Sequence, residues 1–172
     1  MELDCGICRV RSWKKSDVDS VVRHGNNIKI WRNLRDRFPH PYTREAAREW
    51  IEFATVCRPE VDFAIEAEGE AVGGVGMKPG IDVERLSAEI GYWIGEPFWG
   101  KGIATAALSA TVAYAFRELG MVRVFAVPFA TNLASARVLE KAGFVREAVM
   151  RSSAVKEGKV LDQWLYAITR DV

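Results

Sequence analysis

The chain has 172 residues, of which 49% are hydrophobic and 27% charged, a mixture that excludes a disordered or fibrous protein. The length fits a single domain over residues 1–172 and leaves no room for a second domain of ordinary size. A formal net charge of +1 gives no overall field that would draw the chain to nucleic acid or to an anionic membrane.

The charge is nevertheless uneven along the chain. Residues 1–50 hold 11 basic and 7 acidic side chains, whereas residues 51–172 hold 13 basic and 16 acidic ones. We expect the basic surplus to be a solvated helical face rather than a nucleic-acid site, because no motif of interleaved aromatic and basic residues accompanies it.

The cysteines favour a cytoplasmic protein with reduced thiols. Cys5, Cys8 and Cys57 are odd in number, and the first twenty residues contain no apolar run that could act as a secretory leader. Cys5 and Cys8 have the spacing of half a zinc site, but no second pair follows. The longest apolar stretch, within residues 103–116, is too short to span a bilayer. We therefore expect no metal site and no membrane segment.

The first half of the chain predicts five elements from hydrophobic spacing and turn residues. They are a strand at 7–11, a helix at 16–25, a helix at 43–54, and two strands at 62–67 and 71–77. Ser16 and Thr43 are suitable N-caps for the two helices. The last two strands flank a short turn at Gly69 and therefore predict a hairpin.

The second half predicts six further elements. They are a strand at 88–94, a helix at 103–119, a strand at 122–127, a helix at 132–142, and two strands between 145 and 168 that turn at Glu157-Gly158. Gly120 supplies the stop for the long apolar helix. Strands joined mainly by hairpins, with one strand-loop-helix-strand unit, favour an α+β or mixed α/β fold over a doubly wound parallel sheet.

The segment Trp99-Gly100-Lys101-Gly102-Ile103-Ala104 joins a predicted strand to a predicted helix. Its glycines allow a tight turn that directs several backbone N–H groups to one point, at the positive end of the helix dipole. Such a turn can bind phosphate, although its spacing matches neither the nucleoside-triphosphate loop nor the dinucleotide fingerprint. Taken alone, a segment of this kind is more often only a turn.

Three polar residues lie where catalysis could use them, and each also has a structural explanation. Asn132 can cap the helix at 132–142, and Ser135 lies in its first turn. Glu89 is a carboxylate in an otherwise apolar strand, where simple alternation can point it to water. None of the three is decisive alone.

In combination these segments resemble the GNAT superfamily of acyl-CoA-dependent N-acetyltransferases. They are most similar to the RimJ/RimL branch, which acetylates N-terminal amines of ribosomal proteins. The resemblance extends from about Arg9 to Ile168 and is carried by residues 33–42, 88–93, 99–102 and 132–144. It implies an α+β fold with a mostly antiparallel central sheet, flanked by helices, whose fourth and fifth strands splay apart.

The resemblance also implies roles for individual residues. Backbone amides would hold the CoA pyrophosphate at Gly100, Lys101, Gly102, Ile103, Ala104 and Thr105. Tyr92, Trp93 and Ile94 would pair through their backbones with the pantetheine arm, as an added strand does. Asn132 would hydrogen-bond the pantetheine, Ser135 would help the thiolate to leave, and Glu89 would deprotonate the amine.

Two positions depart from the family pattern. Trp99 replaces the usual Gln or Arg and removes one side-chain contact to the phosphate. Leu139 stands where many members carry a tyrosine acid, so that Ser135 or solvent would have to protonate the leaving thiolate.

The expected reaction is direct attack of an amine on the acetyl thioester of acetyl-CoA in a ternary complex. No triad of nucleophile, base and orienting group is visible around Cys57 or Ser135. Deprotonating a lysine costs ~3.3 kcal/mol more than deprotonating an α-amine, so a weakly placed base favours a protein N-terminus. A small amine (amino acid, polyamine or antibiotic) and a non-catalytic acyl-CoA-binding module are the alternatives.

The acceptor should bind between the loop at 30–42 and the hairpin near 152–162. The residues expected to contact it are Trp31, Phe38, Tyr42 and Asp162, with Glu157 and Glu66 as further acids for the ammonium. Core packing is the alternative explanation for the aromatic residues. The expected partners are acetyl-CoA and the amine acceptor, and the choice between monomer and homodimer stays open.

Overall fold

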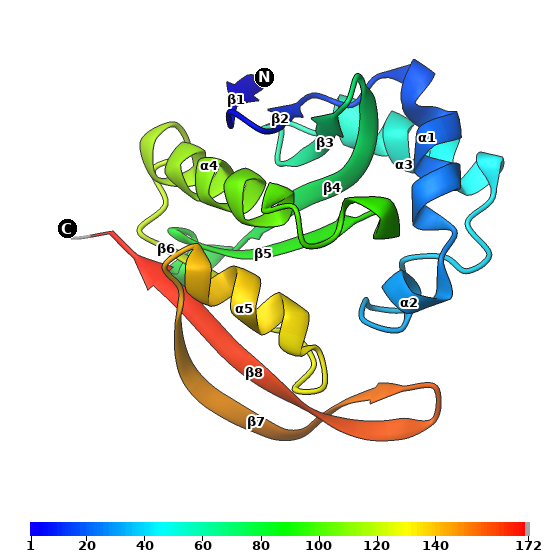
Figure 1. Cartoon of the computed structure of the whole chain (residues 1–172). Helices are drawn as coiled ribbons and strands as arrows, with labels where there is room; N and C mark the ends of the chain where they lie inside the picture. Colours follow the sequence, from blue (N-terminus) through cyan, green and yellow to red (C-terminus); the bar gives the residue numbers. More distant parts are fainter. Residues whose placement is uncertain (171–172) are drawn as a thin grey trace.

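One mixed sheet of eight strands organises the chain, in the order β1-β2-β3-β4-β5-β6-β8-β7 (Figure 1). The computed structural model describes residues 1–170. The strands are Glu2–Asp4 (β1), Arg9–Arg11 (β2), Asp62–Ala67 (β3), Glu70–Pro79 (β4), Ser87–Ile94 (β5), Arg123–Ala126 (β6), Val145–Lys156 (β7) and Lys159–Thr169 (β8). Every neighbouring pair is antiparallel except β5 and β6, which are parallel. The fold is thus the mostly antiparallel α+β arrangement that the resemblance implied.

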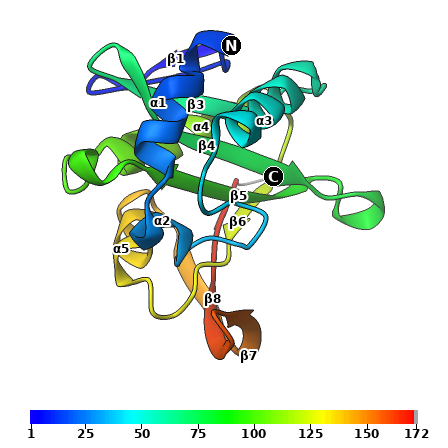
Figure 2. The same ribbon diagram turned by 90° about the vertical axis from the view of Figure 1, so that its right-hand side faces the viewer.

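Helices cover both faces of this sheet (Figure 2). They are Val18–Gly25 (α1), Ile28–Trp31 (α2), Arg44–Val56 (α3), Ile103–Arg117 (α4) and Leu133–Lys141 (α5). α4 and α5 pack on the larger hydrophobic cluster, which includes Leu108 and Leu139. α1 and α3 pack on the smaller one, which includes Val21 and Ile51. The two faces of the sheet therefore have separate cores.

β5 and β6 stay paired for only three residues. Ser87 pairs with Arg123, Ala88 with Val124, and Glu89 with Phe125. β5 then continues to Ile94 paired with β4 alone. The sequence analysis did not predict the short β1, so its fourth and fifth strands correspond to β5 and β6. The separation of β5 from β6 confirms the expected splay. Among residues 1–170, no strand pairs with this edge of β5 beyond Glu89.

Most predicted elements are present, with two additions. β1 and α2 have only three and four residues, too few for hydrophobic periodicity to reveal them. The strand predicted at 7–11 begins only at Arg9, because Cys5 to Cys8 form a turn in which Gly6 has φ of +76°.

The two predicted N-caps have different outcomes. Thr43 caps α3 as expected by accepting a hydrogen bond from the Ala46 N–H at 3.2 Å. The cap predicted at Ser16 is wrong, because a short 3₁₀ turn precedes α1 and makes no side-chain cap. There the Asp17 carboxylate instead accepts the Lys14 N–H at 2.8 Å.

The three cysteines are free thiols. Within residues 1–170 no cluster of three or more His, Cys, Asp or Glu side chains is arranged to hold a metal ion. In the same part of the chain no helix is both long and apolar enough to cross a membrane.

A buried guanidinium joins β2 to its neighbours. Arg11 is 4% exposed and donates to both carboxylate oxygens of Asp17, at 2.8 and 2.9 Å. Its Nε donates to Glu66 on β3, which also forms an ion pair with it. Glu66 is therefore engaged in the structure and is not free to attract an acceptor ammonium, as the sequence had suggested.

We expect Arg11→Ala to lower the free energy of unfolding by about 3–5 kcal/mol, because it leaves two carboxylates without their buried cation. Chemical denaturation monitored by circular dichroism measures this change. Arg9→Ala on the same strand is the control, because Arg9 is half-exposed and its pair with Glu2 is solvated; the expected loss is below about 1 kcal/mol. Equal losses for both variants would contradict this account of Arg11.

Candidate functional site

The glycine-rich segment between β5 and α4 adopts the turn that its sequence predicts. Gly100 and Gly102 have φ of +74° and +79°, a left-handed conformation that other residues rarely adopt. Gly102 is the N-cap of α4, so the free N–H groups of the first helical turn follow it directly. Lys101 Nζ lies 3.6 Å from Glu68 Oε1, so the groups of this turn that could bind an anion are its backbone N–H groups. The residues present therefore fit a pyrophosphate group.

Trp99 ties this loop to the end of β5. Its indole Nε1 donates a hydrogen bond to the Ile94 carbonyl at 2.7 Å, while the side chain is 46% exposed. This contact explains how the loop is held without the usual Gln or Arg. It also uses one lone pair of a carbonyl that was expected to pair with pantetheine.

A tyrosine and a serine meet across the gap between β5 and α5. Asn132 caps α5 as predicted, with its Oδ1 accepting the Ser135 N–H at 3.1 Å. The Tyr92 hydroxyl lies 2.9 Å from Ser135 Oγ and donates toward the Ser135 carbonyl at 3.3 Å. Burial raises the pKa of Tyr92 to about 12, against the opposing effect of the Ser135 hydrogen bond. The phenol thus stays protonated through the neutral range.

Sequence reasoning missed the side chain of Tyr92. It gave Tyr92 a backbone role only and looked for a tyrosine acid at the position of Leu139, which is fully buried in the core. The alternation of β5 carried a signal: Tyr92 points to the same face as Ile90, where α4 and α5 pack.

Glu89 stands at the point where β5 and β6 part, on the opposite face. Its side chain is 23% exposed and forms an ion pair with Arg35, whose Nη2 donates to Glu89 Oε1. Arg35 belongs to the loop between α2 and α3, 54 residues earlier in the sequence. Local sequence patterns do not indicate contacts between residues so far apart in the chain. Arg35 was therefore not among the predicted site residues.

Next to Glu89, the surface of the sheet is formed by two paired glycines, Gly91 on β5 and Gly76 on β4. Gly91 shares the face of Glu89, is exposed, and a methyl group added to it would meet nothing within 4 Å. Gly91 pairs with Gly76, which in turn pairs with Asp62. Asp62 Oδ1 occupies the space that a Cβ on Gly76 would need, so the carboxylate lies directly over Gly76. Asp62 therefore lies in the same row of the sheet as the open surface at Gly91.

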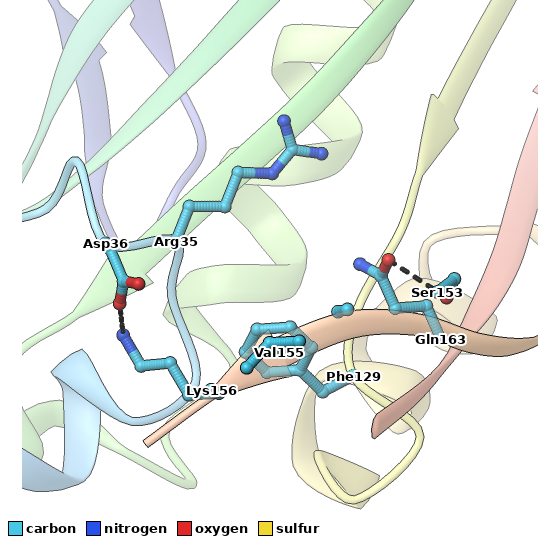
Figure 3. Close-up of a pocket in the computed structure, with 8 residues that line it drawn as sticks. Arg35, Asp36, Phe129, Ser153, Val155, Lys156 and Gln163 are labelled. Atoms are coloured by element: carbon cyan, nitrogen blue, oxygen red, sulfur yellow. Dashed lines mark hydrogen bonds and ion pairs between the residues drawn. The ribbon is translucent and has the colours of Figure 1, made fainter. Parts of the chain in front are cut away.

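A cleft of about 330 Å³ lies between the loop that carries Arg35 and the β7–β8 hairpin (Figure 3). The residues that line it include Arg35, Asp36, Phe129, Val155, Lys156 and Gln163. Figure 3 shows the Arg35 guanidinium directed away from the pair that Asp36 forms with Lys156 at 2.6 Å. The cleft occupies the region where the sequence predicted the acceptor to bind.

The predicted acceptor residues are not all beside this cleft. Trp31 holds the Lys156 ammonium 3.6 Å from its ring centroid. Phe38 and Tyr42 pack in the core cluster beneath α1 and α3, and Phe38 also contacts Trp93. Asp162 accepts the Ser152 N–H at 2.8 Å and so shapes the hairpin. Their roles in acceptor binding stay predictions.

Residues 8–145 match the family model described as an acetyltransferase (GNAT) domain. The uncharacterized N-acetyltransferase YoaA of Bacillus subtilis is 38% identical over 101 residues, which are 59% of this chain and 56% of YoaA. The prophage-derived uncharacterized N-acetyltransferase YokL of the same species is 29% identical, over 89% of this chain and 85% of YokL. The chain thus spans just over half the length of the first of these relatives.

A solved structure extends the likeness to the whole fold. RimL, a ribosomal L7/L12 α-N-protein acetyltransferase in complex with coenzyme A, superposes with a TM-score of 0.87. The superposition covers 98% of both chains at 21% sequence identity. At that identity the likeness concerns the fold.

We expect the stability of the protein to depend on pH through Asp62. Burial raises the pKa of Asp62 from its ordinary 3.8 to about 6, against the opposing field of Arg37. The folded state therefore binds a proton more tightly than the unfolded state, and this contribution to stability is lost as pH rises from about 4 to about 6. Asp62→Asn removes the effect.

The free energies of unfolding of wild type and Asp62→Asn at pH 4 and pH 7 measure this dependence. The advantage of the variant should grow by about 2 kcal/mol between the two pH values. Asp19→Asn, at an exposed carboxylate on α1, is the control and should change by less than about 0.5 kcal/mol. A constant difference between wild type and Asp62→Asn would contradict the burial of this carboxylate.

Proposed function

The chain belongs to the GNAT acetyltransferase family, and from this premise we propose that it transfers an acetyl group from acetyl-CoA to the α-amine of a protein N-terminus. The observation that carries the proposal is the fork between β5 and β6. A carboxylate, Glu89, lies at the fork, and a hydroxyl pair, Tyr92 and Ser135, lies on the other face of β5. A phosphate-binding turn follows at the end of that strand.

The donor side of this site is built from backbone groups. Beyond Glu89 the open edge of β5 offers its N–H and C=O groups to the amides of pantetheine, as a sheet edge does to an added strand. The turn from Gly100 to Thr105 holds the pyrophosphate at the α4 N-terminus. The thioester is thereby placed beside Ser135.

The proposed reaction removes a proton from the amine and delivers one to the departing sulfur. The amine attacks the thioester carbonyl, and Glu89 takes its proton directly or through water. The departing sulfur is protonated by the Ser135 hydroxyl, which the Tyr92 phenol supports at 2.9 Å. Tyr92 thereby supplies the phenol that the family pattern places at the position of Leu139.

An N-terminal α-amine suits this site better than a lysine. An α-amine with a pKa of ~8 is about one tenth neutral at pH 7, whereas a lysine is almost wholly protonated. The fold shared with RimL, a ribosomal-protein acetyltransferase, supports the same substrate class. We place the reaction in the cytoplasm, in keeping with the three free thiols.

A panel of acceptors with acetyl-CoA tests the proposal. Mass spectrometry should find acetylation at the α-amine of N-terminal peptides and not at lysine side chains of the same peptides. Transfer confined to free amino acids, polyamines or aminoglycosides would replace a protein substrate by a small amine. Binding of coenzyme A without transfer to any amine would make the protein a binding module.

We expect Glu89→Gln to lower kcat/KM for the acceptor by about 10²-fold, because the variant cannot take the proton from the amine. The affinity for coenzyme A, measured by titration calorimetry, should be unchanged. Glu118→Gln, at the end of α4 and away from the fork, is the control. If Glu89→Gln keeps the pH dependence of wild type, Glu89 is not the base.

We also expect Tyr92→Phe and Ser135→Ala each to lower kcat more than they raise KM for acetyl-CoA, by about tenfold or more, because each interrupts proton delivery to the sulfur. Since the two hydroxyls act as one unit, the double variant should lose little beyond the larger single loss. Steady-state kinetics of the three variants measure this coupling. Additive losses in the double variant would show that Tyr92 acts independently of Ser135.

A further inference from the structure

The segment that carries Arg35 is fixed against the β7–β8 hairpin. Asp36 forms an ion pair with Lys156 at 2.6 Å, and the Lys156 side chain is only 3% exposed. The same ammonium lies over the ring of Trp31. Lys156 is buried whereas Asp36 is 73% exposed, so this partly buried pair ties the loop that carries Arg35 to the hairpin.

Arg35 and the acceptor compete for one carboxylate. The guanidinium donates to Glu89, the group to which the proposed reaction must bring an ammonium. Two cations at one carboxylate repel each other, so the arrival of the amine weakens the pair of Arg35 with Glu89. Among the described residues that line the cleft, the one carboxylate is Asp36, and Lys156 already pairs with it. The guanidinium released from Glu89 is about half exposed and is therefore able to bind an anion that the acceptor carries.

We propose that the acceptor supplies this anion, so that Arg35 is the residue that selects acceptors carrying a carboxylate close to the reactive amine. This inference rests on the acetyl transfer to an α-amine in the proposed function and names the class of acceptor. Binding is then an exchange of ion pairs, in which the ammonium takes Glu89 and the carboxylate takes Arg35. Arginine suits this role because its planar fork binds carboxylates in a bidentate manner.

Two kinds of acceptor offer such a carboxylate. One is a peptide with an acidic residue directly after its N-terminal residue, and the other is a free amino acid with its own α-carboxylate. The cleft of about 330 Å³ is lined by Phe129 and Gln163 as well as by Arg35 and has room for either. The chemistry that Arg35 recognises is the same in both.

The test compares matched acceptors with the full chain and acetyl-CoA. One pair is two peptides that differ only by Asp or Asn at the second residue, and the other is serine and serine amide. Wild type should prefer the carboxylate-bearing member by about tenfold or more in kcat/KM in at least one pair, and that pair identifies the source. Arg35→Gln should reduce the preference to within about twofold.

Arg44→Gln is the control, since it removes the same charge from an exposed pair with Asp19 on the α1–α3 face. It should keep the wild-type preference. Equal kcat/KM within both acceptor pairs in wild type, or a preference that persists in Arg35→Gln, would overturn the inference.

The inference and the proposed function can fail separately. Acetylation of all acceptors at similar rates would leave the proposed function intact and remove the role of Arg35. If no acceptor is acetylated, the proposed function fails, and calorimetry decides the inference: the same acceptors are titrated into the protein loaded with coenzyme A. Tighter binding of the carboxylate-bearing member by wild type, but not by Arg35→Gln, would still support the inference, and equal binding would overturn it.

Discussion

The whole site depends on how few residues pair β5 with β6. Three pairs join these parallel strands, and after Glu89 they separate. A strand edge inside a sheet is normally satisfied by its neighbour, so this separation leaves backbone groups available to a ligand with amides of its own. The gap also allows the first turn of α5 to bring Ser135 to the hydroxyl of Tyr92. A longer pairing would close the site.

The alternation of side chains along β5 divides the chemistry between two faces. Tyr92 points to the face covered by α4 and α5, where the donor turn lies, whereas Glu89 and Gly91 point to the other face. In the proposed reaction, the amine and Glu89 therefore lie on one side of the strand, and the hydroxyls of Tyr92 and Ser135 lie on the other. Alternation along a single strand would thus separate the two proton transfers of the proposed mechanism.

The sequence predicted best what depends on neighbouring residues. Thr43 and Asn132 are N-caps and Gly102 adopts a left-handed turn, because each depends on the local backbone alone. Contacts between distant segments were not predictable, and the pair of Arg35 with Glu89 is one of them. The burial of Asp62 was not predicted for the same reason, because only the pairing of β3 with β4 places this residue over Gly76.

The basic surplus of the first fifty residues, expected to form a solvated helical face, partly forms ion pairs with the rest of the chain. Basic residues of the first fifty pair with acids of the later chain: Arg32 with Glu157, Lys29 with Glu96 and Arg35 with Glu89. Exposed pairs of this kind contribute only about 0–1 kcal/mol each, so they add little to stability. They are therefore easily opened, whereas the pair of Lys156 with Asp36 is supported by the burial of Lys156 and by the ring of Trp31. In the proposed exchange of ion pairs, this contact keeps the loop in place while Arg35 releases Glu89 and stays within reach of the acceptor.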